Sequence, residues 1–303
     1  RKAQYAPMTS PTTPTISSAA QQRIVDLIAK ELGVTAPQIA AAVTLLDGGA
    51  TVPFIARYRK EATNNLDDTH LRTLEERLLY LRELEERRQT ILASIDEQGK
   101  LTDELRRAVE QAATKQAVED IYLPYKPKRR TKAQIAREAG LEPLANALFA
   151  DPTLDPDQEA AKYVKVVAAA EGVEAVNVPD AKAALEGARD ILVERFAETA
   201  ELLATLRTKL WNEGIVTSTV MPGKETAEEE KFRDYYAYSE TIRTIPSHRA
   251  LAMFRGRTLG VLKLDLGLGE SLEAIVPHPC AAMIAAHFGI ENRGRRADKW
   301  LTD

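Results

Sequence analysis

Six basic side chains gather in the stretch YLPYKPKRRTKAQIAR, residues 122–137, which contains no acidic residue. Lysine and arginine neutralise phosphates, and the two tyrosines that precede them offer aromatic faces on which bases stack. The combination predicts a contact with nucleic acid, single strands above all. The alternative is a solvated loop whose cations pair with acidic neighbours such as DPTLDPD, residues 151–157. The six candidates are Lys126, Lys128, Arg129, Arg130, Lys132 and Arg137.

A second basic group closes the stretch LLDGGATVPFIARYRKEA, residues 45–62. Two helical patterns meet there at a glycine turn, as in a helix-turn-helix, whose second helix reads base edges with its first turn. Here the basic residues Arg57, Arg59 and Lys60 lie at the opposite end of that second helix. They suit a helix C-terminus, and Arg57 is placed to pair with Glu61 four residues on.

The first turn of the same helix, VPFI at residues 52–55, is apolar. Such side chains offer no hydrogen-bond pattern to a base pair, and burial of each large one contributes about 1.5–3 kcal/mol. We therefore expect Phe54 and Ile55 to be buried, and the corner to have a helix-turn-helix shape without base-reading chemistry. Its three basic residues remain candidates for contact with a phosphate backbone or a protein partner.

Residue types that could support catalysis or bind a metal are not spaced for it. The group of histidines and the cysteine at residues 278–287 lacks the paired spacing of a zinc site. Asp67 and Asp68 precede a helical pattern, where N-capping and the helix dipole account for both. The glycines at 267 and 269 are not followed by the Gly-Lys-Ser/Thr of a phosphate loop. We predict no catalytic residue, no cofactor and no metal.

The composition sets wider bounds. The 303 residues include 41 Lys and Arg against 45 Asp and Glu, a formal charge of −4, so nucleic-acid binding would need a local basic patch. The length favours about two domains. The single cysteine, Cys280, fits a reducing compartment, and no apolar run is long enough for a bilayer. We expect a cytoplasmic protein. The Pro/Thr/Ser-rich residues 1–16 are expected to be a disordered leader, with Met8 a candidate natural start.

Helical patterns dominate and position these groups. Apolar residues spaced by three, four and seven predict a long helix over residues 68–98, with a solvated outer face of mixed charge. Thr51 and Thr131 are expected to cap the helices of the two basic regions. Gly187 is expected to mark a bend or a close contact. Further helices are expected after Ser17 or Ser18, Thr35 and Thr102, over residues 159–172, 180–212 and 280–289, and after a Ser247 cap.

Three stretches near the C-terminal end favour strands. IVTSTVM after Gly214 is β-branched, residues 261–266 alternate with a period near two, and EAIVPHP, residues 273–279, is a third candidate. The acidic KETAEEEKFRDYYAYSE is expected to connect them. In PSHRALAMFRG the expected helix buries Leu251, Met253 and Phe254, which leaves its arginines Arg249, Arg255 and Arg257 solvated.

These patterns predict a mainly α protein, a multi-helix scaffold with a helix-turn-helix-like element and a small β-containing subdomain near the C-terminal end. After the leader, we expect a helical N-terminal domain over residues 17–213, with the corner at 35–62 and the long helix at 68–98. A mixed α/β subdomain is expected over 214–291, and the start of a further helix over 292–303.

Several of these segments resemble one family closely. LLDGGATVPFIARYRKEATNNLDD, LEERLLYLRELEERR, EDIYLPYKPKRRTKAQIAREAGLEPLA, FRDYYAYSE and PSHRALAMFRGR are similar to the N-terminal region of Tex proteins. These are bacterial transcription accessory proteins related to the eukaryotic elongation factor Spt-six. The sequence departs from the family at Gly48, where an acidic residue is expected, and at Asn64-Asn65, where glycines are more usual.

The resemblance implies a longer protein, in which a helical scaffold precedes an RNase H-like domain without catalytic residues, helix-hairpin-helix motifs and an S1 domain. The S1 domain, the family's main nucleic-acid binder, has no counterpart in these residues. Residues 292–303 would lead into the absent RNase H-like domain. The implied partners are RNA or DNA, through the full-length protein, and the transcription machinery, RNA polymerase included. The oligomeric state stays open.

Three functions remain open. The first is a non-catalytic scaffold of a transcription accessory factor that associates with RNA and the transcription machinery. The second is a sequence-independent nucleic-acid-binding module that acts through residues 126–137. The third is an enzyme acting on nucleic acid, which would show metal-dependent cleavage.

Overall fold

The computed structural model describes residues 16–165, 177–224, 230–269 and 274–303. These residues are mainly helical, with a three-stranded antiparallel sheet near the C-terminal end, which confirms the predicted fold class. The chain divides into two compact units, unit 1 (Arg1–Tyr122) and unit 2 (Leu123–Asp303). Apart from Ile16, the predicted leader lies outside the described residues. Within the described part, no helix is both long and apolar enough to cross a bilayer.

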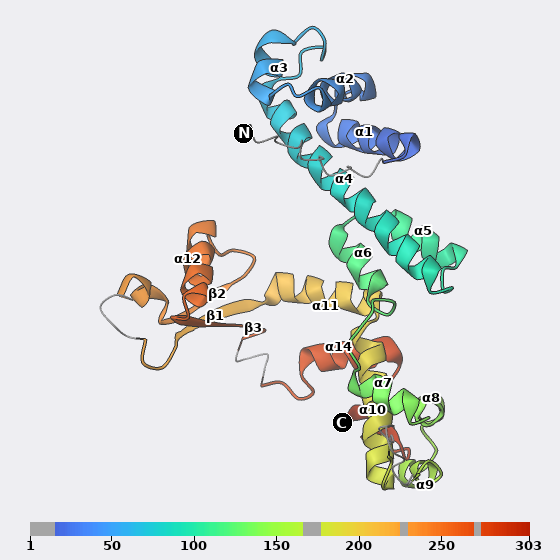
Figure 1. The fold of residues 1–303 in the computed structure, drawn as a ribbon. Helices are drawn as coiled ribbons and strands as arrows, with labels where there is room; N and C mark the ends of the chain where they lie inside the picture. Colours follow the sequence, from blue (N-terminus) through green and yellow to red (C-terminus); the bar gives the residue numbers. More distant parts are fainter. Residues whose placement is uncertain (1–15, 166–176, 225–229, 270–273) are drawn as a thin grey trace, which may run out of the picture. The chain divides into compact units, whose positions relative to one another are not determined.

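Unit 1 is built on one long helix, α4 (Asp68–Glu97), and the predicted helix over 68–98 is thereby confirmed. Asp67 caps α4 by accepting a hydrogen bond from the His70 N–H at 2.8 Å, as expected from the sequence. The other helices of the unit contact α4 along its length (Figure 1). They are α1 (Ser18–Leu32), α2 (Ala36–Asp47), α3 (Val52–Tyr58), α5 (Asp103–Gln111) and α6 (Lys115–Tyr122).

The predicted apolar stripe of α4 forms the core of unit 1. Its members recur at spacings of three, four and seven residues, which keeps them on one face of the 30-residue helix. All of them are buried, and α1 and α2 add Ile28 and Ile39, which are fully buried. The stripe consists of Leu71, Leu74, Leu78, Leu81, Leu84, Ile91 and Ile95.

Arginines on the flank of α4 tie it to its neighbours. Arg77 pairs with Glu31 of α1 at 2.6 Å, and Arg82 pairs with Asp47 of α2 at 2.7 Å. The hydrogen bond from Arg82 lowers the pKa of Asp47 below its ordinary value, against the effect of burial. A third arginine, Arg87, pairs with a glutamate of α6. The mixed charges of α4 are therefore not only a solvated face, because part of them link helices.

The turn between α3 and α4 contains two residues in the left-handed region. Asn64 has φ 47° and Asn65 has φ 64°. L-residues other than glycine pay for this conformation, and asparagine tolerates it best because its side chain hydrogen-bonds locally. The turn conformation is thus the one that glycine favours, and asparagine at these two positions is compatible with it.

Unit 2 contains a helical core around α10 (Ala181–Ala197). Buried residues of this helix, Ala184, Ala188 and Ile191 among them, pack with Leu144 and Leu148 of α8 and with neighbouring elements. Figure 1 shows the shorter helices gathered around α10. They are α7 (Lys132–Glu138), α8 (Glu142–Ala150) and α9 (Pro156–Ala161), and residues of α15 (Asp298–Thr302) pack on the same core.

Gly187 marks a close contact, as one of its two expected roles. A Cβ at this position would lie 2.5 Å from Cδ1 of Leu141 and 3.2 Å from Cβ of Ala136. Atoms at such distances overlap, so a larger residue would push α10 away from α7. The glycine therefore permits the approach that brings Glu194 of α10 next to residues 126–137, called the basic segment below.

The small sheet follows α11 (Ala200–Glu213). Its order is β2-β1-β3, and β1 pairs antiparallel with both neighbours, Ile215 lying opposite Thr241 of β2 and Gly267 of β3. α12 contacts β3, and α14 contacts α11. The elements are β1 (Ile215–Val220), the 3₁₀ helix η1 (Glu230–Tyr235), β2 (Ala237–Thr241), α12 (Ser247–Thr258), β3 (Leu262–Gly267) and α14 (Pro279–Phe288).

Three local predictions are wrong. The third strand is β2, inside the segment expected to be a connection, whereas residues 274–277 of EAIVPHP form bends and turns. Ser247 is the first residue of α12, and Pro246 occupies the cap position. The helix expected over 159–172 ends at Ala161, and its residues from 166 on lie outside the described residues. β2 escaped notice because its residues AYSET are polar and half exposed.

The predicted boundary between residues 213 and 214 falls inside unit 2, and the predicted helical domain 17–213 spans both units. The domain division read from the sequence therefore stays a prediction. The expected helix near the C-terminal end is present as α15, and its Trp300 and Leu301 pack against the helical core of unit 2.

Candidate nucleic-acid interface

The basic segment is an extended loop that leads into a helix. Pro124 and Pro127 stop helix α6 from continuing, since each lacks the N–H that a helix interior needs. Residues 127–131 have no regular structure. Thr131 then caps α7 by accepting a hydrogen bond from the Gln134 N–H at 3.0 Å, as predicted. Four of the six candidate cations lie on the loop, and Lys132 and Arg137 lie on α7.

Three of the six cations are engaged in ion pairs. Arg130 pairs with Glu138 at 2.7 Å, and Arg137 pairs with Glu194 at 2.6 Å and Glu142 at 3.7 Å. Lys128 contacts Glu198 and lies 3.7 Å from Glu194. Paired cations already have a counter-charge, so each has less to gain from a phosphate.

Glu194 of α10 is the centre of this arrangement. Burial by itself would raise its pKa, but hydrogen bonds from Arg137 and Thr131 and the charge of Lys128 outweigh burial and lower the pKa below its ordinary value. Thr131 Oγ1 donates to Glu194 Oε1 at 3.0 Å. The carboxylate thus fixes the end of the loop and the start of α7 on α10, which is a structural use of the basic residues.

The other three cations, Lys126, Arg129 and Lys132, are exposed. Among the described residues their side chains have neither an ion pair nor a hydrogen bond. The basic segment therefore presents about half of the charge that its sequence suggests. The solvated-loop alternative also named the wrong acids, because the partners belong to α7, α8, α10 and the residue after α10, and not to residues 151–157.

One of the two tyrosines is not available for stacking. Tyr122 is buried, its hydroxyl lies 2.9 Å from Ser94 Oγ, and Arg87 lies over its ring at 5.5 Å. The expectation of two exposed rings before the cations is therefore wrong for this one. Tyr125 is partly exposed.

The corner between α2 and α3 differs from its prediction in one residue. Val52 and Ile55 are buried, with 3% and 0% of their surface exposed, as expected. Phe54 is 41% exposed, so the prediction that it is buried is wrong. A seven-residue helix has one inward face, and residues three apart, Val52 and Ile55, occupy it.

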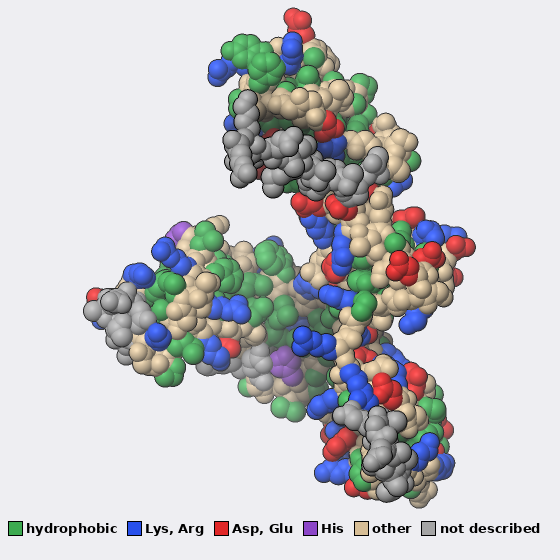
Figure 2. Space-filling view, viewed as in Figure 1, with side chains coloured by type: hydrophobic (Ala, Val, Ile, Leu, Met, Phe, Trp, Pro, Cys, Tyr) green, Lys and Arg blue, Asp and Glu red, His purple; other side chains and the backbone are tan. Residues whose placement is uncertain are grey.

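The exposed Phe54 belongs to a small cluster of rings and cations. Its ring centroid lies 5.4 Å from that of Tyr58, which is 64% exposed, and the Arg59 guanidinium lies 5.6 Å from the Phe54 ring. Figure 2 shows hydrophobic and basic side chains side by side over α3. Arg57, Arg59 and Lys60 are exposed, and among the described residues none of them has an ion pair.

The expected pair between Arg57 and Glu61 does not form. Helix α3 ends at Tyr58, so the two residues are not on successive turns of one helix. Beside the ring cluster, a shallow pocket of unit 1 is lined by Arg57, Lys60, Arg72 and Asp68 together with Pro53 and Ala56. Arg72 is paired with Asp68 at 2.6 Å, which leaves the other two basic residues as its open charges.

A further exposed surface lies on α12. Met253 is buried as predicted, but Leu251 is 67% and Phe254 54% exposed, so the prediction that these two are buried is wrong. Arg249 contacts Glu240 at 3.4 Å, whereas Arg255 and Arg257 are exposed. The buried face of α12 instead contains Gly256, where a Cβ would lie 2.5 Å from Leu262 Cδ1.

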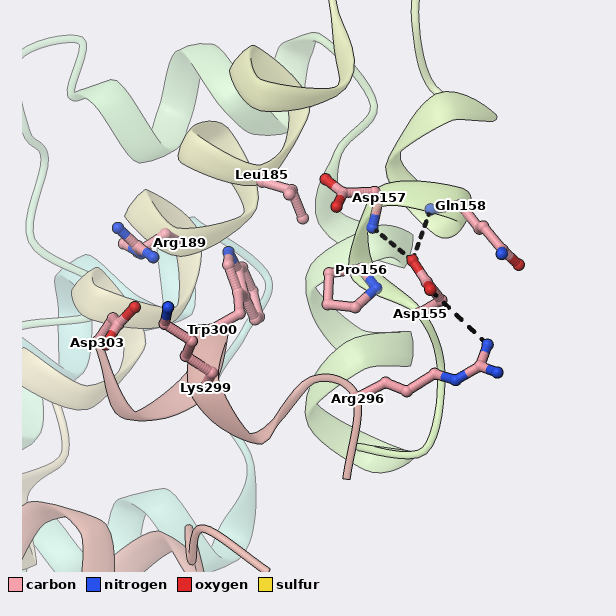
Figure 3. Close-up of a pocket in the computed structure, with 10 residues that line it drawn as sticks. All are labelled: Asp155, Pro156, Asp157, Gln158, Leu185, Arg189, Arg296, Lys299, Trp300 and Asp303. Atoms are coloured by element: carbon pink, nitrogen blue, oxygen red, sulfur yellow. Dashed lines mark hydrogen bonds and ion pairs between the residues drawn. The ribbon is translucent and has the colours of Figure 1, made fainter. Parts of the chain in front are cut away.

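Sequence reasoning overlooked a pocket at the end of unit 2 (Figure 3). Its walls come from α9, α10 and α15, with Trp300 on one side and Asp155 on the other. Asp155 caps α9 through the N–H groups of Asp157 and Gln158 and lies 3.7 Å from Arg296. The acidic and basic side chains around it include Arg189, Lys299 and Asp303, so the pocket has no dominant sign of charge.

The histidine and cysteine group at residues 278–287 has structural contacts. His278 caps α14, its Nδ1 accepting a hydrogen bond from the Cys280 N–H at 3.2 Å, and His287 packs edge-on against Phe288. Among the described residues no three His, Cys, Asp or Glu side chains are grouped as a metal site would need.

Two protein families match parts of the chain, one in each unit. The Tex-like protein N-terminal domain matches residues 22–96, and the Tex central region-like family matches residues 151–303. Relatives include Protein tex of Bordetella pertussis, 56% identical over 94% of this chain, and Transcriptional accessory protein Tex of Neisseria gonorrhoeae, 60% identical over 92%. S1 RNA-binding domain-containing protein 1 of Homo sapiens is 29% identical over 76% of the chain.

The chain spans 35% of the length of the two bacterial relatives and 23% of the human one. The match to Tex proteins extends over nearly the whole chain and includes the corner, the long helix and the core of unit 2. The chain belongs to the Tex family, as its N-terminal region.

Proposed function

We propose that the chain is the non-catalytic N-terminal scaffold of a transcription accessory factor, acting in the cytoplasm. Its partners in this proposal are RNA or DNA, reached through the full-length protein, and the transcription machinery, RNA polymerase included. The names of the Neisseria gonorrhoeae relative, a transcriptional accessory protein, and of the human S1 RNA-binding domain-containing protein support this choice of partners.

The observation that carries the proposal is a set of ion pairs between α4 and the other helices of unit 1. Arg77, Arg82 and Arg87 of α4 each pair with an acid of a different helix, so α4 connects α1, α2 and α6. Salt bridges at half-exposed positions add little stability singly, and here they link α4 to three other helices. Such a framework suits the positioning of other domains and of partners.

The test of the scaffold compares this chain with the full-length Bordetella pertussis relative. Binding to one single-stranded RNA and one duplex DNA is measured by fluorescence anisotropy at several salt concentrations. We expect the full-length protein to bind at least about tenfold more tightly, a difference of roughly 1.4 kcal/mol. Equal affinities would contradict a scaffold that depends on other domains for its main nucleic-acid contact.

Catalysis is tested separately with labelled RNA and DNA and Mg²⁺. The scaffold proposal expects both substrates to stay intact after prolonged incubation with the purified chain. Cleavage that EDTA abolishes and that co-purifies with the chain through two further columns would establish an enzyme acting on nucleic acid and overturn the proposal.

A second candidate function is a nucleic-acid-binding module that acts through residues 126–137. It is favoured by the three exposed cations Lys126, Arg129 and Lys132, which have no partner among the described residues. Three neutralised phosphates give log K against log salt a slope of about −2 on a single strand. A slope near zero for the purified chain would remove this function.

A further inference from the structure

We propose that the corner at α3 is a single-strand binding site in which a nucleobase stacks on Tyr58 while Arg57 and Lys60 contact the adjoining phosphates. The site would be sequence-independent and would take RNA or DNA. It rests on the proposed contact with nucleic acid, but it uses other residues than the basic segment and lies in the other unit.

The rings supply the stacking surface. Tyr58 is 64% exposed, and Phe54, one turn earlier on the same face of α3, supports it from the side at 5.4 Å between centroids. Arg59 lies over Phe54, so the face of Phe54 is already used and the Tyr58 ring is the more open one. Every base has an aromatic face, which makes stacking tolerant of sequence.

Arg57 lies on the neighbouring face of the same helix, and Lys60 follows two residues after the helix ends. Arg57 and Lys60 line the shallow pocket together with Pro53 and Ala56, and this face is about 100° around the helix from the face of the rings. A base on Tyr58 and a phosphate over the pocket would therefore lie on adjacent sides of one short helix. This is the arrangement of stacking ring beside positive groove that single-strand binders use.

Charge favours a nucleic acid over a protein as the occupant. The exposed cations are Arg57, Arg59 and Lys60, and the carboxylates near them are Glu61, which is exposed, and Asp68, which is held by Arg72. The branched aliphatic residues of α3, Val52 and Ile55, are buried, so the exposed apolar surface of this helix consists mainly of the two aromatic rings with Pro53. The core of a protein interface is poor in charged residues, whereas exposed cations border these rings.

Duplex reading is not part of the proposal. A recognition helix presents hydrogen-bonding side chains in its first turn, and the first turn of α3 is Val52, Pro53 and Phe54. Tyr58 and the cations lie in the second turn and just after it. A stacked base must be unpaired, so the site selects single strands by geometry.

The test measures affinity of the 303-residue chain for a labelled single-stranded 12-mer, as RNA and as DNA, and for a duplex of the same sequence. Tyr58→Ala is expected to weaken binding to both single strands roughly five- to a hundred-fold. Tyr58→Phe, which keeps the ring, is expected to bind within about twofold of wild type. Duplex binding is expected to be the same in all three proteins.

Controls keep the result interpretable. Trp211, an exposed ring on α11 at 57% exposure, serves as the matched position, and Trp211→Ala should leave affinity unchanged. Because Tyr58 is exposed, the alanine variant should melt as wild type does, and circular dichroism checks this. The double variant Arg57→Gln, Lys60→Gln should reduce the salt slope by about 1.4 in magnitude.

The outcomes separate this inference from the proposed function. Unchanged single-strand affinity in Tyr58→Ala overturns the inference, and the proposed contact through residues 126–137 stands if Gln at Lys126, Arg129 and Lys132 still weakens binding. If Tyr58→Ala instead loses binding to core RNA polymerase and keeps its affinity for oligonucleotides, the corner is a protein-docking surface, and the inference is overturned as well. Absence of any single-strand binding by the chain overturns this inference and the binding module of residues 126–137, and leaves the scaffold proposal standing.

Discussion

The two basic regions of the chain look alike as sequence and differ in their surroundings. In residues 126–137, glutamates of α7, α8 and α10 and the neighbouring Glu198 engage Lys128, Arg130 and Arg137, and the ring of Tyr122 is buried. At the corner, the exposed cations have no ion pair among the described residues, and two rings face solvent. The corner, which has fewer basic residues in the sequence than residues 126–137, thus leaves all of its cations without an ion pair among the described residues.

The difference teaches that a run of cations does not measure the charge available to a ligand. What decides is whether an acidic side chain reaches the run from elsewhere in the fold. Glu194 is more than fifty residues from each basic residue that it contacts, so no local pattern announces it. The following predictions test or sharpen this comparison.

The largest effect is expected inside the corner itself. Ile55→Ala empties a fully buried position and should destabilise unit 1 by about 2–5 kcal/mol. Phe54→Ala removes an exposed ring and should change stability by only about 0.5 kcal/mol. Urea unfolding followed by circular dichroism compares the two variants. Equal losses would mean that Phe54 belongs to the core after all.

A second effect should appear where α10 approaches α7. Gly187→Val places side-chain atoms where Leu141 Cδ1 lies 2.5 Å from an added Cβ, and should destabilise unit 2 by about 1–3 kcal/mol. If Glu194 of α10 holds cations of the basic segment, the affinity of the same variant for single strands should also fall more steeply as the salt concentration rises. Thermal melting and salt-dependent anisotropy measure the two effects, and a melt unchanged from wild type would contradict the close contact.

A smaller effect is expected for Glu194→Gln. The variant keeps the shape of the side chain and removes the charge that Arg137 and Lys128 contact. Arg137 and Lys128 keep their contacts with Glu142 and Glu198, so the magnitude of the salt slope on a single strand should increase by no more than about 1.4. The change in stability at neutral pH should be less than about 1 kcal/mol, because the pair is partly exposed. An unchanged slope would show that these cations are not held back by Glu194.

The pH dependence of the stability of unit 2 tests whether the ion pairs of Glu194 stabilise the fold. The pKa of Glu194 in the folded chain lies below its ordinary value of 4.5, so the ionised form is favoured by folding. Its contribution is complete above the unfolded pKa and is lost as pH falls from 4.5 through the folded pKa. Wild type should therefore lose stability more steeply than Glu194→Gln over that range, as measured by urea unfolding. Parallel curves would contradict the assignment.

The sequence predicts well what local chemistry determines. The caps Asp67, Thr102 and Thr131 and the apolar stripe of α4 were predictable, because a cap or a helical face depends on residues within a few positions. The exposure of Phe54 and Phe254 was not, because an apolar residue is buried only if the fold brings another element over it. β2 was hidden by its polar composition, which reflects strand positions that face solvent.

The candidate site was predictable only as a set of residue types. The residues Arg57, Arg59 and Lys60 were identified by charge, while Tyr58 was not, since its openness depends on where α3 ends and what covers it. The division of the segment 126–137 into held and free cations needed the position of α10. That position depends on Gly187, whose significance only the neighbouring Leu141 reveals.

The most direct test compares two triple variants of the basic segment. In one, Lys126, Arg129 and Lys132 are replaced by Gln, and in the other Lys128, Arg130 and Arg137 are. Both remove three charges from the same sixteen residues, and salt-dependent binding to a single-stranded RNA is measured for each. The first should reduce the salt slope by about 2 in magnitude and the second should leave it nearly unchanged. Equal reductions, or a larger one in the second variant, would contradict the claim that partners elsewhere in the fold decide which cations a nucleic acid can use.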